Sequence, residues 1–295
     1  MRSVFDWNIG SRTLTLGKRT YIMGVVNVTP DSFSDGSVHH DPEKAVAHAL
    51  TLLEQGADII DVGGESTRPG ATVQPGMSAQ KVVVTEKEEL ERVIPVITAL
   101  KKKRSDVVIS IDTYKSNVAR ASIAAGAEIV NDVSGFRWDT KMPKTIAELK
   151  CGAVLMHTRG RPDEWRDLPK VDDIVMLVKR ELRDWADVAL MAGAKRERLA
   201  LDPGFGFGKR FQENYPLLRR FDEFHQLRYP MLVGVSRKSF IGRALARNGT
   251  DVPVSERAFG TVAAETALIL KGAHIIRTHD VRACADAARL ADMVS

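Results

Sequence analysis

Residues 21–28 read YIMGVVNV, and their side chains are apolar on both faces, as expected for a strand whose sheet is covered by helices. A polar, turn-rich segment and then an amphipathic stretch follow this run, and the same succession recurs along the chain. The further β-like runs are Asp58–Val62, Val107–Asp112, Glu128–Val133, Ala153–His157, Leu199–Leu201, Met231–Val235 and His274–Thr278. Eight strand–helix alternations in 295 residues predict an α/β fold, a closed (β/α)₈ or TIM barrel, with an open doubly wound sheet as the alternative.

The intervening segments show helical periodicity and helix-end signals. In 86–103 apolar residues recur at i, i+3, i+4, i+7 and i+10, and Thr85 with Glu88 forms a capping box. The stretch 172–192 is a second such helix, which Gly193 would end. Asp41-Pro42 predicts an N-cap followed by Pro at the first helical position.

The segment before the first barrel strand predicts a β-hairpin. It runs from Val4 to Leu16 with Gly10-Ser11 at its centre. We expect residues 1–19 to cap the bottom of the barrel and residues 1–295 to form a single domain, because no composition shift marks a linker.

Composition excludes several functional classes. The chain is 44% hydrophobic and 27% charged, and its net charge of +5 comes from scattered Lys and Arg without an aromatic-rich basic stripe, so we expect no nucleic-acid partner. No apolar run approaches the roughly 20 residues of a membrane helix, and residues 1–10 lack the apolar core of a signal peptide. Cys151 and Cys284 are far apart and lack metal-binding spacing, so the sequence predicts a protein of the reducing cytoplasm.

Polar side chains gather where the predicted strands end. In a barrel these ends form one rim, which is where such folds place their chemistry. All eight strand ends carry hydrogen-bonding or charged residues, in the segments 27–36, 61–70, 112–113, 131–132, 157–160, 202–204, 236–239 and 277–280. Their convergence predicts a binding site at the carboxyl ends of the strands.

Single residues in this set also have structural interpretations. Asp112 and Asp132 could each be the N-cap of the following helix, and Asn131 could satisfy loop backbone. His157 is better explained as a packing residue of the rim. The glycines of Gly204–Lys209 do not have the spacing of a phosphate-binding loop, and Arg210 stands where that motif needs Ser or Thr.

Longer blocks within this pattern resemble one known family. The segment 23–36, MGVVNVTPDSFSDG, resembles the first signature of dihydropteroate synthases, and 61–70, DVGGESTRPG, resembles their second. The segments 110–113, 130–135, 201–209, 234–240 and 276–281 match further blocks in the same order. Two places depart from the family pattern: Ser37 stands where a second glycine is common, and Ala71–Val84 is longer than expected.

The resemblance implies a transferase of folate biosynthesis. Such an enzyme joins 6-hydroxymethyl-7,8-dihydropterin pyrophosphate to p-aminobenzoate, which sulfonamides mimic, and it releases 7,8-dihydropteroate and pyrophosphate. The family also implies Mg²⁺ and a homodimer. The implied catalytic residues are Asn27, Asp112, Lys238 and Arg277. The implied pterin-binding residues are Asp112, Asn131, Met156, Asp202 and Lys238. The implied pyrophosphate-binding residues are Asn27, Thr67, Arg68, Arg277, Thr278 and His279. The implied p-aminobenzoate-binding residues are Phe33, Thr67, Pro69, Phe207, Ser236 and Ser239.

The residue types suit this chemistry. A carboxylate such as Asp202 can accept two adjacent N–H groups of the pterin, and charge-assisted bidentate bonds are strong. Arg277 can bind phosphate as a fork, and a hard Mg²⁺ that keeps most of its waters needs little more than the side-chain oxygen of Asn27. Two alternatives are a pterin-binding methyltransferase, which needs a corrinoid partner, and a non-catalytic pterin-binding paralogue. The segments 29–36, 236–239 and 277–279 favour the synthase over the methyltransferase.

Overall fold

The computed structural model describes residues 2–29, 42–65 and 84–295. Its centre is an eight-stranded parallel sheet with strand order β8-β7-β6-β5-β4-β3-β10-β9. These strands are β3 Tyr21–Asn27, β4 Ile59–Gly63, β5 Val108–Asp112, β6 Ile129–Asp132, β7 Gly152–Met156, β8 Leu199–Asp202, β9 Leu232–Val233 and β10 Ile275–Thr278. Each overlaps one of the eight runs predicted from the sequence, and β9 is shorter than its predicted run, 231–235.

The sheet closes into a barrel between β8 and β9. A parallel bridge joins Leu201 to Met231, and the Leu201 N–H donates to the Pro230 carbonyl at 2.9 Å. β9 is the shortest strand, with two residues, so the barrel is held more weakly here than at the five-residue ladder between β4 and β5. The prediction of a (β/α)₈ barrel is confirmed.

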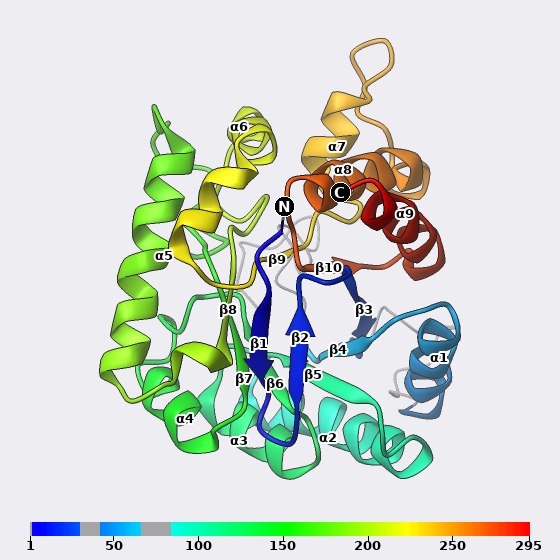
Figure 1. The fold of residues 1–295 in the computed structure, drawn as a ribbon, viewed down its shortest axis with the longest axis vertical. Coiled ribbons are helices and arrows are strands. Elements are labelled where there is room, and N and C mark those ends of the chain that lie inside the picture. The colour runs from blue at the N-terminus through cyan, green and yellow to red at the C-terminus, as the bar shows by residue number, and fades with distance from the viewer. Residues whose placement is uncertain (1, 30–41, 66–83) are drawn as a thin grey trace, which may run out of the picture.

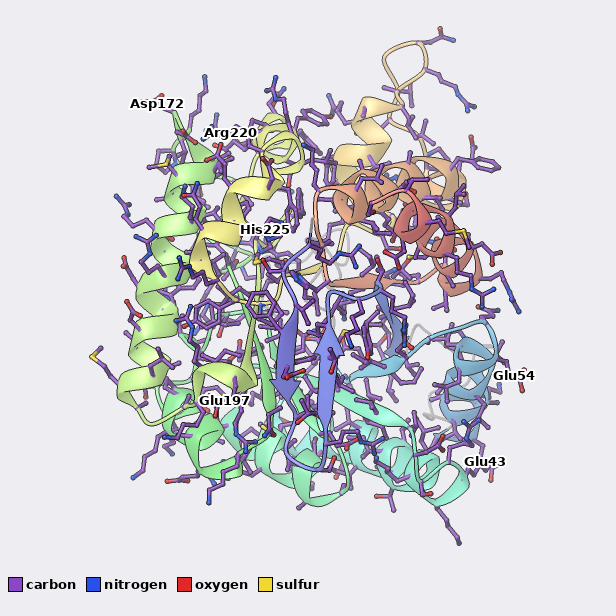
Figure 2. The ribbon with its side chains drawn as sticks, in the orientation of Figure 1. Glu43, Glu54, Asp172, Glu197, Arg220 and His225 are labelled. Atoms are coloured by element: carbon purple, nitrogen blue, oxygen red, sulfur yellow. The ribbon has the colours of Figure 1, made fainter. Side chains whose placement is uncertain are left out.

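Helices surround the barrel and form an outer ring (Figure 1). They are α1 Pro42–Glu54, α2 Glu86–Lys103, α3 Ser116–Ala124, α4 Met142–Leu149, α5 Ile174–Met191, α6 Asn214–Arg219, α7 Ser239–Ala244, α8 Ala258–Leu270 and α9 Val281–Met293. Short 3₁₀ turns are η1 Arg196–Arg198, η2 Phe211–Glu213, η3 Phe221–Leu227 and η4 Val254–Glu256. Charged side chains such as Glu54 of α1 lie on the periphery of this ring (Figure 2).

The predicted helix ends are largely confirmed. α2 begins after the Thr85–Glu88 capping box, in which each residue's side chain bonds the other's backbone N–H. α5 begins two residues later than predicted, because the Asp173 side chain accepts hydrogen bonds from the N–H groups of Val175 and Met176 and so acts as the N-cap. Pro42 is the first residue of α1, whereas its predicted N-cap, Asp41, lies outside the described residues.

The N-terminal hairpin seals the barrel bottom, as predicted. β1 Phe5–Asn8 pairs antiparallel with β2 Thr13–Leu16, and the pair lies across the middle of the ring of helices (Figure 1). Trp7, Ile9 and Leu16 are buried against one apolar residue from each barrel strand: Met23, Ile59, Val108, Ile129, Val154, Ala200, Leu232 and Ile275. The indole N–H of Trp7 donates to the Arg198 carbonyl at 2.9 Å.

Two separate apolar cores result from the alternation of side chains along each strand. The inward-facing layer named above forms the core under the hairpin. The outward-facing residues pack against the helices in a second, larger core, which includes Ile60, Ile111, Leu155, Leu201 and Ile276. Among the described residues, no helix combines the length and apolar character needed to cross a lipid bilayer.

Candidate active site

A cavity of about 350 Å³ opens at the carboxyl ends of the barrel strands. Most of the described residues that the sequence assigned to substrate or metal line it together. These are Asn27, Asp112, Asn131, Met156, Asp202, Phe207, Ser236, Lys238, Ser239, Arg277 and His279. The structure therefore gathers side chains from distant parts of the chain into one site, as the barrel prediction required.

Strand periodicity explains why these side chains face inward. Two residues beyond the sealed apolar layer, each strand presents its next inward position. These positions are Val25, Asp61, Ser110, Asn131, Met156, Asp202, Gly234 and Arg277. Two residues further on, Asn27, Asp112, Ser236 and His279 reach the same cavity. The interior thus changes from apolar to polar within one step of the pleat.

Arg277 is the centre of the charged floor. Its Nε donates to Asp61 Oδ2 at 2.6 Å and its Nη2 donates to Asp112 Oδ2 at 2.7 Å. Although burial lowers the pKa of this guanidinium, the carboxylates of Asp61 and Asp112 outweigh burial and raise it. Arg277 is therefore a permanent cation, oriented by two carboxylates that come from different strands.

The carboxyl group of Asp112 is buried and lies beside the charged Arg277 side chain. Burial raises the pKa of its carboxyl to about 7, and the neighbouring Arg277 opposes that rise. Because its carboxylate faces Arg277 and the cavity, Asp112 is a site residue and not the N-cap of the next helix. The N-cap position of α3 belongs to Lys115.

Asp202, Asn131 and Lys238 offer the groups that a flat heterocycle needs. Asp202 is 4% exposed; its Oδ1 accepts the Gly204 N–H at 2.7 Å, and burial raises its pKa against the pull of Lys238. Asn131 donates through Nδ2 to Asp61 Oδ2 at 3.1 Å. The Lys238 ammonium donates to the Phe205 carbonyl at 2.5 Å.

The outer part of the cavity is more aromatic. The Lys238 ammonium lies over the ring of Phe207, 4.5 Å from its centroid, and the indole of Trp165 makes an edge-to-face contact with the same ring, with 5.5 Å between centroids. Ser239, the first residue of α7, also lines this region. The Ser236 hydroxyl lies 3.1 Å from His279 Nδ1 and accepts the His279 N–H, so two residues with different predicted roles form one unit.

Some predicted site residues do not join this set. Phe33, Thr67, Arg68 and Pro69 lie outside the described residues. Thr278 follows the inward-facing Arg277, so its side chain points away from the cavity, where its hydroxyl accepts the Asp280 N–H at 3.2 Å. A pyrophosphate contact through the Thr278 side chain therefore does not fit its placement.

Two rim residues turn out to be structural. Asp132 is fully buried, and its Oδ1 accepts hydrogen bonds from the N–H and hydroxyl of Ser134, both at 2.6 Å. His157 is also fully buried, and its ring stacks on Trp185 with 5.0 Å between centroids, which agrees with the packing role predicted for it.

Sequence reasoning gave no role to several residues that the structure places at or beside the site, among them Asp61, Trp165 and Arg257. Asp61 orients both Arg277 and Asn131, and its other oxygen, Oδ1, is buried without a hydrogen-bond partner among the described residues. Its signal was a lone charge inside the apolar strand Ile59–Gly63. Trp165 and Arg257 line the cavity from loops, where no strand period predicts direction.

The Asn27 side chain is suited to share a hard cation with an anionic ligand. It ends β3 and lines the cavity with a side-chain amide oxygen. In the part of the chain that the structure describes, no group of three or more His, Cys, Asp or Glu side chains could hold a metal.

Comparisons with known proteins agree on one family. Residues 23–279 match the family of pterin binding enzymes. The dihydropteroate synthase of Clostridium beijerinckii is 43% identical over 97% of this chain and 98% of its own length. The Xanthomonas albilineans dihydropteroate synthase, solved with 4-aminobenzoic acid, superposes with a TM-score of 0.86 at 42% identity, covering 99% of this chain and 98% of that one. It has also been solved in complex with 7,8-dihydropteroate. The Yersinia pestis synthase in a sulfonamide complex superposes at 0.84 with 39% identity, covering 95% and 96%.

Proposed function

Because this chain belongs to the dihydropteroate synthase family of pterin binding enzymes, we propose that it makes 7,8-dihydropteroate. The substrates are 6-hydroxymethyl-7,8-dihydropterin pyrophosphate and p-aminobenzoate, and pyrophosphate leaves. The observation that carries the proposal is the ring of inward side chains in which Asp202 and Asn131 face one cavity with the Asp112–Arg277 pair. A carboxylate and an amide recognise the edge of a pterin, and a fixed guanidinium receives its leaving group.

Each residue of the floor has a distinct part in holding the pterin. Asp202 accepts two adjacent N–H groups of the 2-amino-4-oxo edge as a bidentate acceptor. Asn131 both donates and accepts at the neighbouring edge, and Lys238 donates to the carbonyl oxygen. Met156 supplies an apolar contact for the ring. The strand ladders fix the backbone of Asn131, Met156 and Asp202, and side-chain bonds hold Asn131 to Asp61 and Asp202 to Gly204, so this part of the pocket is organised before the substrate arrives.

The reaction is a substitution at the pterin methylene. In a dissociative path, the C–O bond breaks with its electron pair going to pyrophosphate, and the methylene becomes cationic. The amine nitrogen of p-aminobenzoate then forms the new C–N bond and releases a proton. Arg277 and His279 stabilise the leaving group, while Asp112 stabilises the cation, so catalysis consists of electrostatic stabilisation and positioning.

The acceptor binds toward the aromatic end of the cavity. Phe207 offers a ring edge and face, and Ser239 lies beside it. The predicted contributions of Phe33, Thr67 and Pro69 to this subsite, and of Thr67 and Arg68 to pyrophosphate, rest on the family resemblance. Since sulfonamides resemble p-aminobenzoate, we expect them to compete for this subsite.

Asn27 would hold Mg²⁺ jointly with pyrophosphate oxygens. When bound, the ion supplies charge neutralisation for the departing diphosphate. The expected result of Asn27→Ala is a weaker Mg²⁺ dependence of pyrophosphate binding, which calorimetry in the presence and absence of Mg²⁺ measures without requiring turnover.

The protein acts as a homodimer in the cytoplasm, and α8 offers an apolar surface for the pairing. Phe259 is 91% exposed on this helix and Leu270 is half exposed at its end. Phe259→Glu is expected to convert the dimer to monomer in sedimentation velocity, whereas Met191→Glu on the distant helix α5 should not. A wild-type monomer would contradict this assignment.

One assay separates the synthase from its rivals. Incubation with pterin pyrophosphate and p-aminobenzoate should release pyrophosphate and dihydropteroate in equal amounts. A methyltransferase would release neither and would need a corrinoid protein. A non-catalytic paralogue would bind pterin without turnover and would fail to rescue a host that lacks its own synthase.

A further inference from the structure

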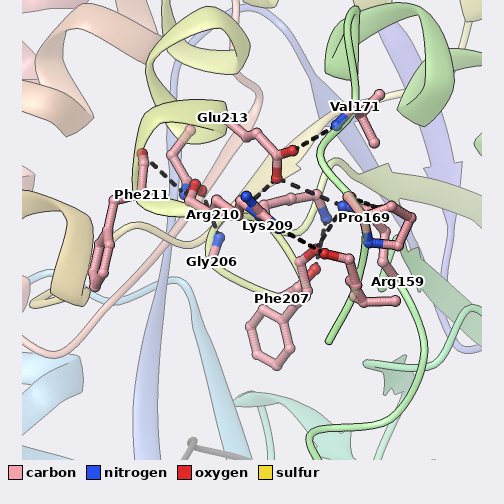
Figure 3. A network of polar contacts seen from close by, with 12 residues as sticks. Arg159, Pro169, Val171, Gly206, Phe207, Lys209, Arg210, Phe211 and Glu213 are labelled. Atoms are coloured by element: carbon pink, nitrogen blue, oxygen red, sulfur yellow. Dashed lines mark hydrogen bonds and ion pairs between the residues drawn. The ribbon is translucent and has the colours of Figure 1, made fainter. Parts of the chain in front are cut away.

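The glycine-rich loop Gly204–Lys209 surrounds a buried cation. Lys209 is 7% exposed, and its ammonium lies 2.8 Å from the Gly204 carbonyl, 3.1 Å from the Phe207 carbonyl and 3.0 Å from the His157 carbonyl. It also lies 2.8 Å from His157 Nδ1. The loop thus folds around its own lysine, which points into the protein and joins the end of β7 to the loop after β8 (Figure 3).

In this network each group donates toward Glu181: Lys209 donates to His157, and His157 donates to Glu181. His157 Nε2 is 3.0 Å from a carboxylate oxygen of Glu181 on α5, and a carboxylate only accepts, so Nε2 carries the proton. Nδ1 is then an acceptor, like the three carbonyls. The three N–H groups of the Lys209 ammonium therefore face four acceptors, and two of these acceptors share one N–H. Removing the Lys209 ammonium would leave buried carbonyl groups without their donor, which is costly in a dry interior.

The glycines permit the close packing that this arrangement needs. Gly204 has φ +66°, and a Cβ there would lie 1.9 Å from the His157 carbonyl oxygen. Gly208 has φ +65°, and a Cβ there would lie 2.3 Å from the Arg159 carbonyl oxygen. The loop backbone therefore packs directly on the segment after β7, and Lys209 donates hydrogen bonds to the carbonyls that are brought together.

A second contact connects the same two loops nearer the cavity. Arg159 donates to the Gly208 carbonyl at 3.3 Å and to the Pro169 carbonyl at 2.8 Å, and its Nη1 lies 3.6 Å from Glu213 (Figure 3). Glu213 in turn accepts the Val171 N–H at 3.0 Å. These contacts join the loop that bears Trp165 to the loop that bears Phe207, the two rings that meet edge-on at the cavity wall.

We propose that Lys209 is a positioning residue for the acceptor subsite, because it fixes the loop that places Phe207 at the aromatic end of the cavity. This inference rests on the proposed function, since it assigns the aromatic end of the cavity to p-aminobenzoate. The pterin-facing Asp112, Asn131 and Asp202 belong to strands β5, β6 and β8, which are held by their own ladders. Of these three side chains only Asp202 also contacts the loop, through the Gly204 N–H. Loss of the ammonium should therefore affect the acceptor far more than the pterin.

The first experiment compares the two Michaelis constants in Lys209→Met. We expect KM for p-aminobenzoate to rise about tenfold and KM for the pterin substrate to change less than about threefold, since small displacements of a positioning wall cost this much. Lys195→Met, at an exposed lysine near the barrel bottom, is the matched control and should change neither. An unchanged KM for p-aminobenzoate, or equal increases in both constants, would overturn the proposal.

Chemical rescue tests the ammonium itself. Lys209→Ala removes three methylene groups and the amine, which n-propylamine replaces atom for atom. Added n-propylamine should lower KM for p-aminobenzoate by about fivefold in this variant, because it restores the donor. Propan-1-ol, of the same size but with one donor and no charge, should do so less. Rescue that is equal for both compounds would refute a role for the ammonium.

A third variant keeps the test decisive if both Lys209 variants fail to fold. Glu181→Ala removes the partly exposed carboxylate that accepts from His157 at the outer end of the Lys209–His157–Glu181 hydrogen-bond series. We expect it to raise KM for p-aminobenzoate alone, by about threefold. No change would overturn the proposal. A wild-type chain that forms no dihydropteroate refutes the proposed function, whereas an active wild type with unaffected variants refutes only the positioning role.

Discussion

At the scale of single residues, the Asp112–Arg277–Asp61 cluster determines what the cavity can stabilise. The single guanidinium of Arg277 forms ion pairs with two carboxylates, so its positive charge balances only part of their negative charge. A departing diphosphate can bind near Arg277 while a cationic methylene stays near Asp112. In a water-poor site such oriented charges act strongly, because they need no reorganisation as the bond breaks.

Substituting Asp112 tests this electrostatic role. We expect Asp112→Asn to lower kcat by roughly 10²-fold, as loss of one oriented group does elsewhere, with a smaller effect on pterin affinity. Burial raises the pKa of Asp112 to about 7, and the ionised form is the active one, so wild-type kcat should decline as pH falls through that value. This pH-dependent decline should be missing in the variant. A variant with near-normal turnover and an unaltered pH profile would contradict the role.

Site residues were predictable from the sequence where a strand ends in an unexpected polar group. Asn131, Asp202 and Arg277 stand out because an apolar strand precedes each of them, and the barrel geometry brings such ends together. Asp61 was named only as the first residue of a polar strand end, 61–70, and was given no role of its own. Its role depends on Arg277, 216 residues away, and no local pattern records that partner.

At the scale of elements, strands and helices were predicted more closely than the loops between them. Periodicity determined eight strands, and caps such as Thr85–Glu88 determined helix starts. The segment 157–173 has no such period, so neither the inward direction of Trp165 nor its contact with Phe207 was foreseeable. Its position follows from side-chain to backbone bonds such as those of Arg159 with the Gly208 and Pro169 carbonyls, which no local sequence pattern records.

The Trp165 loop has its own testable consequence. We expect Trp165→Leu to raise KM for p-aminobenzoate about three- to tenfold, because an aromatic pair contributes roughly 0.5–1.5 kcal/mol beyond area burial. Binding of p-aminobenzoate should also change tryptophan fluorescence in the wild type but much less in this variant. Trp138→Leu, which removes an indole that meets Tyr114 edge-on, is the control and should keep the response. Equal responses in all three proteins would exclude Trp165 from the subsite.

At the scale of the whole molecule, the barrel separates stability from chemistry. The hairpin and the apolar layer beneath it seal one end, the larger core lies between sheet and helices, and the polar groups of the site occupy the open end. Closure itself was predictable from eight alternations, but the weak β8–β9 seam was not. Its two-residue strand depends on the backbone geometry around Pro230 and Met231.

One buried acid outside the site should make global stability depend on pH. Glu265 of α8 is fully buried beside Thr278 and Cys284, and among the described residues no hydrogen bond of ordinary geometry reaches its carboxylate oxygens. Burial raises its pKa from 4.5 to about 7, so the folded protein keeps this proton at a pH where the unfolded chain has lost it. The contribution of Glu265 to the free energy of unfolding is fully present below about pH 4.5 and is lost as pH rises to about 7. The loss is about 3 kcal/mol at most.

Glu265→Gln removes that titration and leaves the other buried acids in place. The free energy of unfolding, measured with urea from about pH 5 to about pH 8, should therefore fall less steeply with pH in the variant than in the wild type. The difference between the two curves isolates Glu265 from Asp112 and Asp132, whose raised pKa values contribute equally to both proteins. Glu197→Gln, at an exposed position in η1, is the control and should parallel the wild type. Parallel curves for Glu265→Gln and the wild type would mean that Glu265 is already ionised in the folded protein, and that the space around it admits water or a cation.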